Sequence, residues 1–215
     1  MSLRAWLESC PLVAILRGVK PAEVEALGDA LVTNGFRVIE VPLNSPDPYT
    51  SIAMLSKRLN ARALVGAGTV MTAAQVEQVA AAGGQLIVMP HADARVLRAA
   101  KALGLIALPG FATPTEAFAM LEAGADGLKL FPAEANPPAA LRAMRAVLPR
   151  ETLILPVGGI TALNMSEYWK ASANGFGLGS ALYQPGYSAA EVQTHAREFM
   201  RALKLFQSAQ GASQQ

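Results

Sequence analysis

The sequence of 215 residues has few of the residues that build disulfide frameworks or metal centres. Cys10 is its single cysteine, which excludes an internal disulfide and a thiolate metal cluster. Its two histidines, His91 and His195, are far apart in the sequence. We therefore expect no metal site. His195 is expected on the surface of the last helix, whereas His91 either contacts a ligand or caps a helix.

Long hydrophobic runs and dense charge are also lacking. No run of about 18 uncharged apolar residues occurs, so no membrane span is expected, and Trp6-Leu7-Glu8 is unlike a secretory signal. The 18 basic and 16 acidic residues form no basic stripe, which argues against binding of nucleic acid. These absences predict a soluble cytoplasmic protein with neither a membrane nor a nucleic-acid partner.

Hydrophobic residues are abundant, at 52% of the chain, and they are arranged in a regular order. Short apolar segments alternate with longer segments of helical spacing. The predicted strands are residues 12–17, 37–42, 63–69, 85–90, 105–110, 126–132, 153–159 and 174–180. Capping boxes predict helix starts at Thr72, Thr113 and Ser188.

Eight strands that alternate with helices predict an α/β fold with a parallel sheet. An open doubly wound sheet would alternate in the same way. Eight units without a midpoint or linker favour closure into a (β/α)8 TIM barrel. We expect one compact domain over residues 1–207, with a short helix at residues 3–8 across the barrel bottom and a frayed tail at residues 208–215.

The most informative residue is Lys129, which interrupts an apolar strand. If Leu128 and Leu130 face the helices, Lys129 points into the barrel, where burial lowers the pKa of its amine. A partly neutral lysine can attack a ketone and form a Schiff base. The alternatives are a lysine that reaches solvent at the barrel mouth and one that pairs with a carboxylate for structure.

Glu40 follows the same logic with the opposite charge. It shares the inward face of its strand with Val38 and Pro42, and an inward carboxylate near an inward lysine can move protons. The alternative is a static ion pair of Glu40 with Lys129 or Arg17. Three inward charges on three strands nevertheless indicate a site, because each one is costly to bury.

Glycines follow the last two predicted strands, at Gly158-Gly159 and at Gly179-Ser180. Barrels commonly bind phosphate there through backbone N–H groups that glycine leaves uncovered. The alternative is that these are ordinary tight turns between a strand and a helix.

The chain resembles the class I 2-keto-3-deoxy-6-phosphogluconate and 6-phosphogalactonate aldolases over nearly its whole length. The stretches that carry the resemblance are LVAILRG, VIEVPLNS, LVGAGTV, QLIVMP, PGFATPTEA, LKLFPAE, VGGI and GLGSALY. The resemblance implies a cytoplasmic, homotrimeric (β/α)8 lyase of carbohydrate metabolism that uses no cofactor. Its members release pyruvate and glyceraldehyde 3-phosphate from a phosphorylated keto-deoxy sugar acid.

The resemblance also implies roles for individual residues. Lys129 would form the Schiff base and Glu40 would be the general acid and base. The substrate-binding residues would be Arg17 and Thr69 at the pyruvate carboxylate, Pro90 and Phe131 along the pocket, and Gly158, Gly159, Gly179 and Ser180 at the phosphate.

Two departures from the gluconate-type members favour the galactonate type. Asn44 stands where those members carry arginine, and Val157 stands where they carry threonine. The predicted substrate is therefore 2-dehydro-3-deoxy-6-phosphogalactonate, with the gluconate epimer or dual specificity as alternatives. The expected pocket departs from both types at His91 and Phe111.

Two other classes of function stay open at this point. One is a phosphate-binding isomerase or synthase in which Glu40 is the base and Lys129 acts only through its charge. The other is a barrel without activity that binds phosphosugars.

Overall fold

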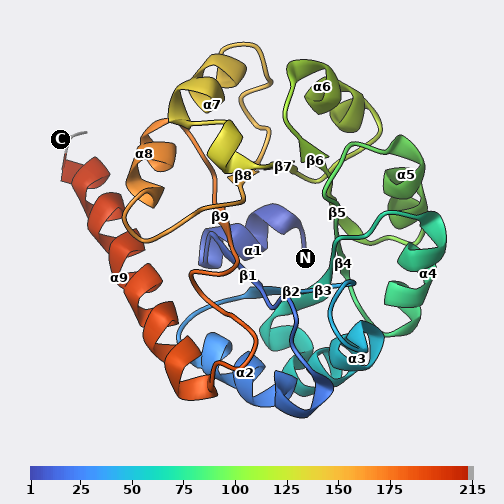
Figure 1. The fold of residues 1–215 in the computed structure, drawn as a ribbon. Coiled ribbons are helices and arrows are strands. Elements are labelled where there is room, and N and C mark those ends of the chain that lie inside the picture. The colour runs from blue at the N-terminus through green and yellow to red at the C-terminus, as the bar shows by residue number, and fades with distance from the viewer. Residues whose placement is uncertain (213–215) are drawn as a thin grey trace.

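Two parallel sheets surrounded by helices form the fold of residues 1–212, the part of the chain that this computed structural model describes (Figure 1). The strands are β1 (Leu12–Ile15), β2 (Val38–Pro42), β3 (Leu64–Gly68), β4 (Leu86–Val88), β5 (Ile106–Leu108), β6 (Gly110–Phe111), β7 (Leu128–Leu130), β8 (Ile154–Pro156) and β9 (Phe176–Leu178). The helices are α1 (Leu3–Ser9), α2 (Pro21–Thr33), α3 (Pro48–Leu59), α4 (Ala73–Ala81), α5 (Ala94–Ala102), α6 (Pro114–Glu122), α7 (Pro138–Arg145), α8 (Met165–Lys170) and α9 (Ala189–Ala212), and the short 3-10 turns are η1 (Asn60–Arg62) and η2 (Ala133–Ala135).

The strands follow chain order around a common axis. One sheet has the order β5-β4-β3-β2-β1-β9 and the other has the order β6-β7-β8. Every predicted strand segment contains a strand. The fifth contains β5 and the first residue of β6, because Pro109, which has no N–H, lies between these two strands. The amide of Lys129 donates to the carbonyl of Pro109 at 2.9 Å, and a bridge pairs Val157 with Gly177. The first contact joins the two sheets between β5 and β7, and the second joins them between β8 and β9.

Side chains alternate between two hydrophobic layers along each strand. Leu12 and Ala14 of β1 pack with the surrounding helices, whereas Val13 belongs to a separate inner cluster. In β7, Leu128 and Leu130 belong to the outer layer. This period of two places Lys129, between those leucines, on the inner side.

Helix α1 covers the amino-terminal ends of the strands. Its buried Leu3, Trp6 and Leu7 belong to the inner cluster, together with side chains from six strands or their flanks. Those partners are Val13, Val38, Leu64, Leu86, Val88, Leu108, Leu153 and Leu155. The inner space is therefore filled with apolar side chains at this end.

The sequence signals for helix starts are confirmed. The hydroxyls of Thr72 and Thr113 accept hydrogen bonds from the amides of Gln75 and Glu116, and each partner's side chain bonds back to the cap. Ser188 accepts a hydrogen bond from the amide of Glu191 at 3.3 Å in the same way. These caps satisfy amides that would otherwise lack partners at the helix ends.

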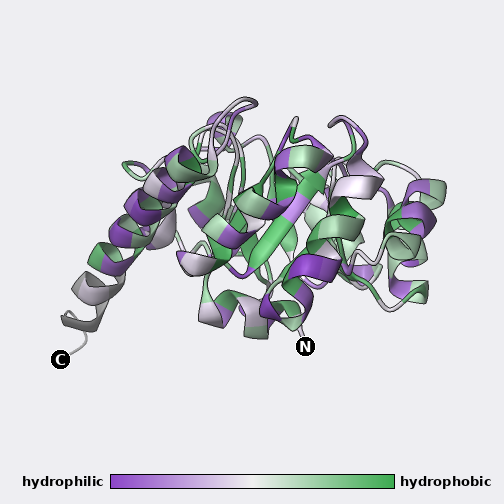
Figure 2. Cartoon of the chain, turned by 90° about the horizontal axis from the view of Figure 1, so that it is seen from below, coloured by the Kyte–Doolittle hydropathy of each residue, from purple (hydrophilic) through white to green (hydrophobic). Residues whose placement is uncertain are grey.

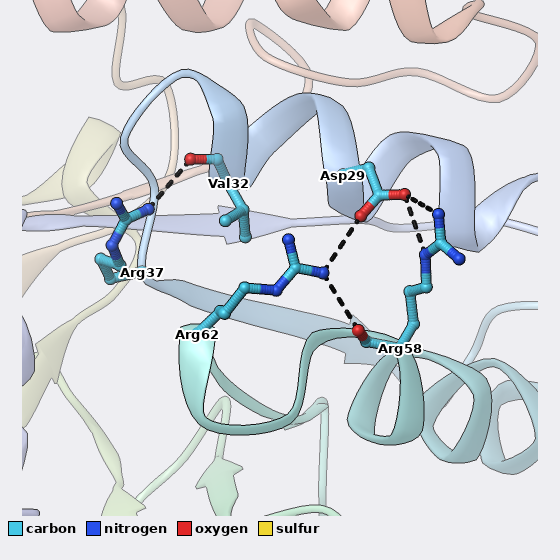
Figure 3. Close-up of polar contacts among 5 residues, drawn as sticks. All are labelled: Asp29, Val32, Arg37, Arg58 and Arg62. Carbon is cyan, nitrogen blue, oxygen red and sulfur yellow. Dashed lines mark hydrogen bonds and ion pairs between the residues drawn. The ribbon is translucent and has the colours of Figure 1, made fainter.

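Arginine side chains link α2, α3 and η1 near β2. Nε and Nη2 of Arg58 donate to Oδ2 of Asp29 at 2.9 and 2.6 Å, and Nη2 of Arg62 donates to Oδ1 of Asp29 at 3.4 Å (Figure 3). Nη1 of Arg37 donates to the carbonyl of Val32 at 3.0 Å. The contacts of Asp29 tie α2 to α3 and η1, and the contact of Arg37 ties the start of β2 to the end of α2.

Hydrophobic residues gather on the central strands and hydrophilic residues gather on the outer faces of the helices (Figure 2). Helix α9 continues to Ala212 and so includes the start of the segment 208–215 that was predicted to fray. Residues 213–215 of that segment lie outside the described residues. Within residues 1–212, no helix is both long and apolar enough to cross a membrane.

Candidate active site

A cavity of about 710 Å³ opens at the carboxyl ends of the strands. Most of the predicted site residues line it, and they come from strands on all sides of the axis. They are Arg17, Thr69, Pro90, Lys129, Phe131, Val157, Gly158, Gly159, Gly179 and Ser180. Of the other two predicted residues, Glu40 is buried beside Gly68, and Asn44 contacts Arg17.

Lys129 reaches the cavity from the middle of β7. The residue is only 4% exposed, and its Nζ lies 4.7 Å from the centroid of the Phe131 ring. Burial lowers the pKa of the Lys129 amine, Glu40 opposes that shift, and Arg17 adds to it. The lowered pKa increases the share of neutral amine, which is the nucleophilic form.

Glu40 is buried beside the cavity, with 1% of the residue exposed. Its Oε2 has no hydrogen-bond partner among residues 1–212, and a Cβ on Gly68 would overlap the carboxylate. Burial raises the pKa of Glu40 to about 7, although Lys129 and Arg17 act in the opposite direction. Glu40 can therefore hold or release a proton near neutral pH.

The buried charges of Glu40 and Lys129 are not locked in ion pairs. Among residues 1–212, no ion pair within 4.0 Å joins Glu40 to Lys129 or to Arg17, although their charges act on one another's pKa. This arrangement does not fit the static ion pair that the sequence left open. The amine of Lys129 lines the cavity, whereas Glu40 is buried and is not among the lining residues.

Arg17 lies after the end of β1 and is exposed at the rim of the cavity, so it is not the third buried charge that the sequence predicted. Two neighbours hold its guanidinium. Its Nη1 donates to Oδ1 of Asn44 at 2.6 Å, and its Nη2 lies 3.5 Å from Oγ1 of Thr69. Thr69 follows β3 directly and has a φ of 56°, in the left-handed region that few non-glycine residues adopt. The guanidinium is exposed and retains donors for a carboxylate.

Glycines form another part of the cavity wall. Gly158 and Gly159 have φ values of 105° and 62°, which favour glycine. A Cβ on either residue would collide with the side chain of Glu134, whereas a Cβ on Gly179 would meet nothing within 4 Å. The backbone is therefore open to a ligand at Gly179, and Glu134 flanks the Gly158-Gly159 turn.

Sequence reasoning missed Glu134, Tyr183 and Gln184, which also line the cavity. They lie outside the strands, where no period of two predicts the direction of a side chain. The suggestion that His91 and Phe111 belong to the pocket is wrong, since neither lines the cavity. Phe111 packs in the outer hydrophobic layer, and Asp93 rather than His91 caps α5.

His195 differs from its predicted surface position. It is half-buried, with Nδ1 3.1 Å from the carbonyl of Leu182 and its ring 5.3 Å from that of Tyr187. The residues that the structure describes contain no group of three or more His, Cys, Asp or Glu side chains suited to a metal ion.

Comparison with known proteins identifies chains similar to this one. The family model described as KDPG and KHG aldolase matches residues 3–197. A probable 2-dehydro-3-deoxy-6-phosphogalactonate aldolase of Rhizobium meliloti (strain 1021) is 50% identical over 186 residues, which are 86% of this chain and 88% of the relative.

Two solved structures extend the comparison. A structure described as native KDPGal superposes with a TM-score of 0.91 at 42% identity and covers 92% of this chain and 96% of its own. A KDPG aldolase from Legionella pneumophila, with pyruvate captured at low pH as a covalent carbinolamine intermediate, has a TM-score of 0.80 at 26% identity. That match covers 94% of this chain and 96% of the other.

Proposed function

This chain belongs to the KDPG and KHG aldolase family, and from that premise we propose that it cleaves 2-dehydro-3-deoxy-6-phosphogalactonate. The products are pyruvate and D-glyceraldehyde 3-phosphate. The observation that carries the proposal is a buried lysine amine, Lys129, that opens into the cavity without an ion-pair partner. That geometry suits a Schiff-base lyase better than an isomerase that needs only a fixed positive charge.

The reaction starts with attack of the neutral Lys129 amine on the C2 ketone of the substrate. The resulting carbinolamine loses water and becomes an iminium ion, which withdraws electrons from the C3–C4 bond. Glu40 accepts the proton of the C4 hydroxyl while that bond breaks, so the aldehyde departs and an enamine remains on Lys129. Protonation of the enamine at C3 and addition of water to the imine then release pyruvate and regenerate the amine.

The ends of the substrate are held by different parts of the cavity wall. Arg17, braced by Asn44 and supported by Thr69, binds the carboxylate. Pro90 and Phe131 shape the wall around the pyruvyl group. The phosphate is bound by the backbone at Gly158, Gly159 and Gly179 and by the hydroxyl of Ser180, since these positions line the cavity together.

Val157 and Asn44 support the galactonate epimer within this proposal. Val157 lines the cavity next to Gly158, so an apolar side chain stands where a hydroxyl could otherwise bond to the substrate. Asn44 bonds to Arg17 and thereby influences the carboxylate end. One or two such contacts are worth about 1–3 kcal/mol, which is enough to set a preference between epimers.

The proposal includes the setting in which the site works. Residues 1–207 form one domain whose two sheets close into a (β/α)8 TIM barrel, supported by the junctions at Pro109 and at Val157. The protein acts in the cytoplasm, in galactonate catabolism, as a homotrimer. Light scattering on the purified protein tests the trimer, and a mass of one or two chains would contradict it.

The test of function is cleavage of the two phosphorylated acids, measured as kcat/KM from the release of pyruvate. We expect the galactonate acid to react faster than the gluconate acid. The matched variant Val157→Thr should narrow that difference, because it adds a hydroxyl at nearly constant volume. Equal or faster cleavage of the gluconate acid by the unaltered protein would overturn the choice of epimer, and no pyruvate from either acid would overturn the function.

A further inference from the structure

The loop between β9 and α9 is tied to the loop between β1 and α2 beside the cavity. Figure 1 shows α2 and α9 side by side, and β9 pairs with β1 in the sheet. The first of these loops carries Gly179 and Ser180, and the second carries Arg17. The two loops therefore hold opposite ends of the substrate under the proposed function.

Tyr183 makes the tie between them. Its ring is buried, 2% exposed, and lines the cavity. Its amide donates to the carbonyl of Gly179 at 3.0 Å, while its hydroxyl donates to Oε1 of Glu23 at 3.0 Å. One residue thus bonds at its backbone to the turn before it and at its side chain to α2.

Glu23 in turn is bonded to the loop that carries Arg17. Its Oε1 also accepts from the amide of Lys20, which is the N-cap of α2 and lies three residues after Arg17. A second contact supports this link, since a Cβ on Gly18 would stand 2.7 Å from Cγ of Pro185. The two loops therefore contact each other at Gly18 and Pro185 as well as through the Tyr183–Glu23 hydrogen bond.

We propose that Tyr183 is a positioning residue that fixes the spacing between the carboxylate-binding loop and the phosphate-binding loop. This inference rests on the proposed function, because it concerns a ligand that reaches both loops. A short ligand that occupies one loop is insensitive to the spacing. The six-carbon phosphorylated acid occupies both, so it binds well only when the spacing is correct.

The experiment compares Tyr183→Phe with Tyr187→Phe, a matched removal of a hydroxyl from a tyrosine that does not line the cavity. For Tyr183→Phe we expect KM for the six-carbon acid to rise about tenfold, since hydrogen bonds to charged groups are among the stronger ones. We expect kcat to change less than twofold. Tyr187→Phe should leave both constants within twofold of the unaltered protein.

Two short probes distinguish a spacing role from general damage. The pyruvate concentration for half-maximal borohydride trapping and the Kd of inorganic phosphate, measured by calorimetry, should both stay within twofold in Tyr183→Phe. Equal weakening of all three ligands, or an unchanged KM for the long acid, would overturn the inference.

A double variant tests the path through Glu23. The double variant Tyr183→Phe/Glu23→Gln should have the same KM as Tyr183→Phe alone. The hydrogen bond between the two residues is already lost in the single variant, so the change at Glu23 should add nothing. Additive effects would contradict the path. Failure of the proposed function would appear differently, as an absence of cleavage by the unaltered protein.

Discussion

Inward-facing side chains fill both ends of the strands, but they have different roles at the two ends. At the amino-terminal end, Val13, Val38 and Leu64 pack beneath α1 and exclude water. Farther along the same strands or their neighbours, Glu40 and Lys129 are also almost fully buried, yet they are charged residues next to a cavity. Burial stabilises the first group, whereas it shifts the pKa values of the second.

We therefore expect stability and turnover to depend on different residues. Substitutions at the closed end should change the free energy of unfolding and leave turnover intact. Substitutions of the buried charges at the open end should do the reverse, because a buried charge contributes little to stability.

The largest effect is expected for Lys129→Ala. Removal of the nucleophile should lower kcat by at least about 10⁴-fold, since the covalent path is lost. The melting temperature should stay the same or rise, because a buried amine without an ion-pair partner is removed. Steady-state kinetics and thermal unfolding test both statements, and Lys129→Met is a control of closer volume. Substantial turnover in either variant would place the chemistry elsewhere.

Glu40→Gln should lower kcat by about 10²- to 10⁴-fold, the usual range for the loss of a general base. Under the proposed mechanism the unaltered protein needs the carboxylate form of Glu40. Burial raises the pKa of Glu40 to about 7, so kcat/KM should fall as the pH drops below 7. Glutamine does not titrate, so this dependence should disappear in the variant. A pH–rate profile that is the same in both proteins would contradict the role of Glu40.

The same carboxyl group predicts how stability depends on pH. Because its pKa is higher in the folded protein than its ordinary value of 4.5, the folded state retains a proton that the unfolded state has lost between about pH 4.5 and 7. The contribution of Glu40 to stability should therefore decrease as the pH rises through that window. Denaturant unfolding of Glu40→Gln should lack this component.

Gly68→Ala should have an intermediate effect, because the new Cβ would overlap the Glu40 carboxylate. Displacement of that group by about 1 Å should lower kcat by about 10²-fold, and the added atom should destabilise the fold by about 1–3 kcal/mol. Both quantities follow from steady-state kinetics and denaturant unfolding. In the background of Glu40→Ala the same glycine substitution should destabilise the protein much less, and an undiminished loss there would show that the contact is not the cause.

The smallest effect on activity is expected for Trp6→Ala at the closed end. Loss of this buried ring should lower the free energy of unfolding by about 3–5 kcal/mol. The activity of each folded molecule should be unchanged, measured as kcat at a temperature where the variant is folded. Leu163→Ala is the control, since that side chain is 90% exposed and should change stability by less than about 0.5 kcal/mol. A fall in kcat of the folded Trp6 variant would contradict the claim that the closed end affects stability and not turnover.

The sequence predicted the strands and the inward direction of Lys129 because a period of two follows from strand geometry alone. It could not predict Tyr183 or Glu134, whose positions depend on loops that pack across the cavity. Nor could it assign Gly68, since the reason for that glycine is a carboxylate contributed by a neighbouring strand. Local patterns thus predicted which strand residues lie at the candidate site, whereas contacts between distant segments define how the site is positioned.

The most direct test of the central claim is borohydride reduction in the presence of pyruvate, followed by mass spectrometry of the peptides. The neutral amine at Lys129 should form an imine that reduction makes permanent, so one pyruvate-sized adduct should appear on Lys129 and on no other lysine. An active, folded protein that carries no adduct, or carries it on a different residue, would contradict the account.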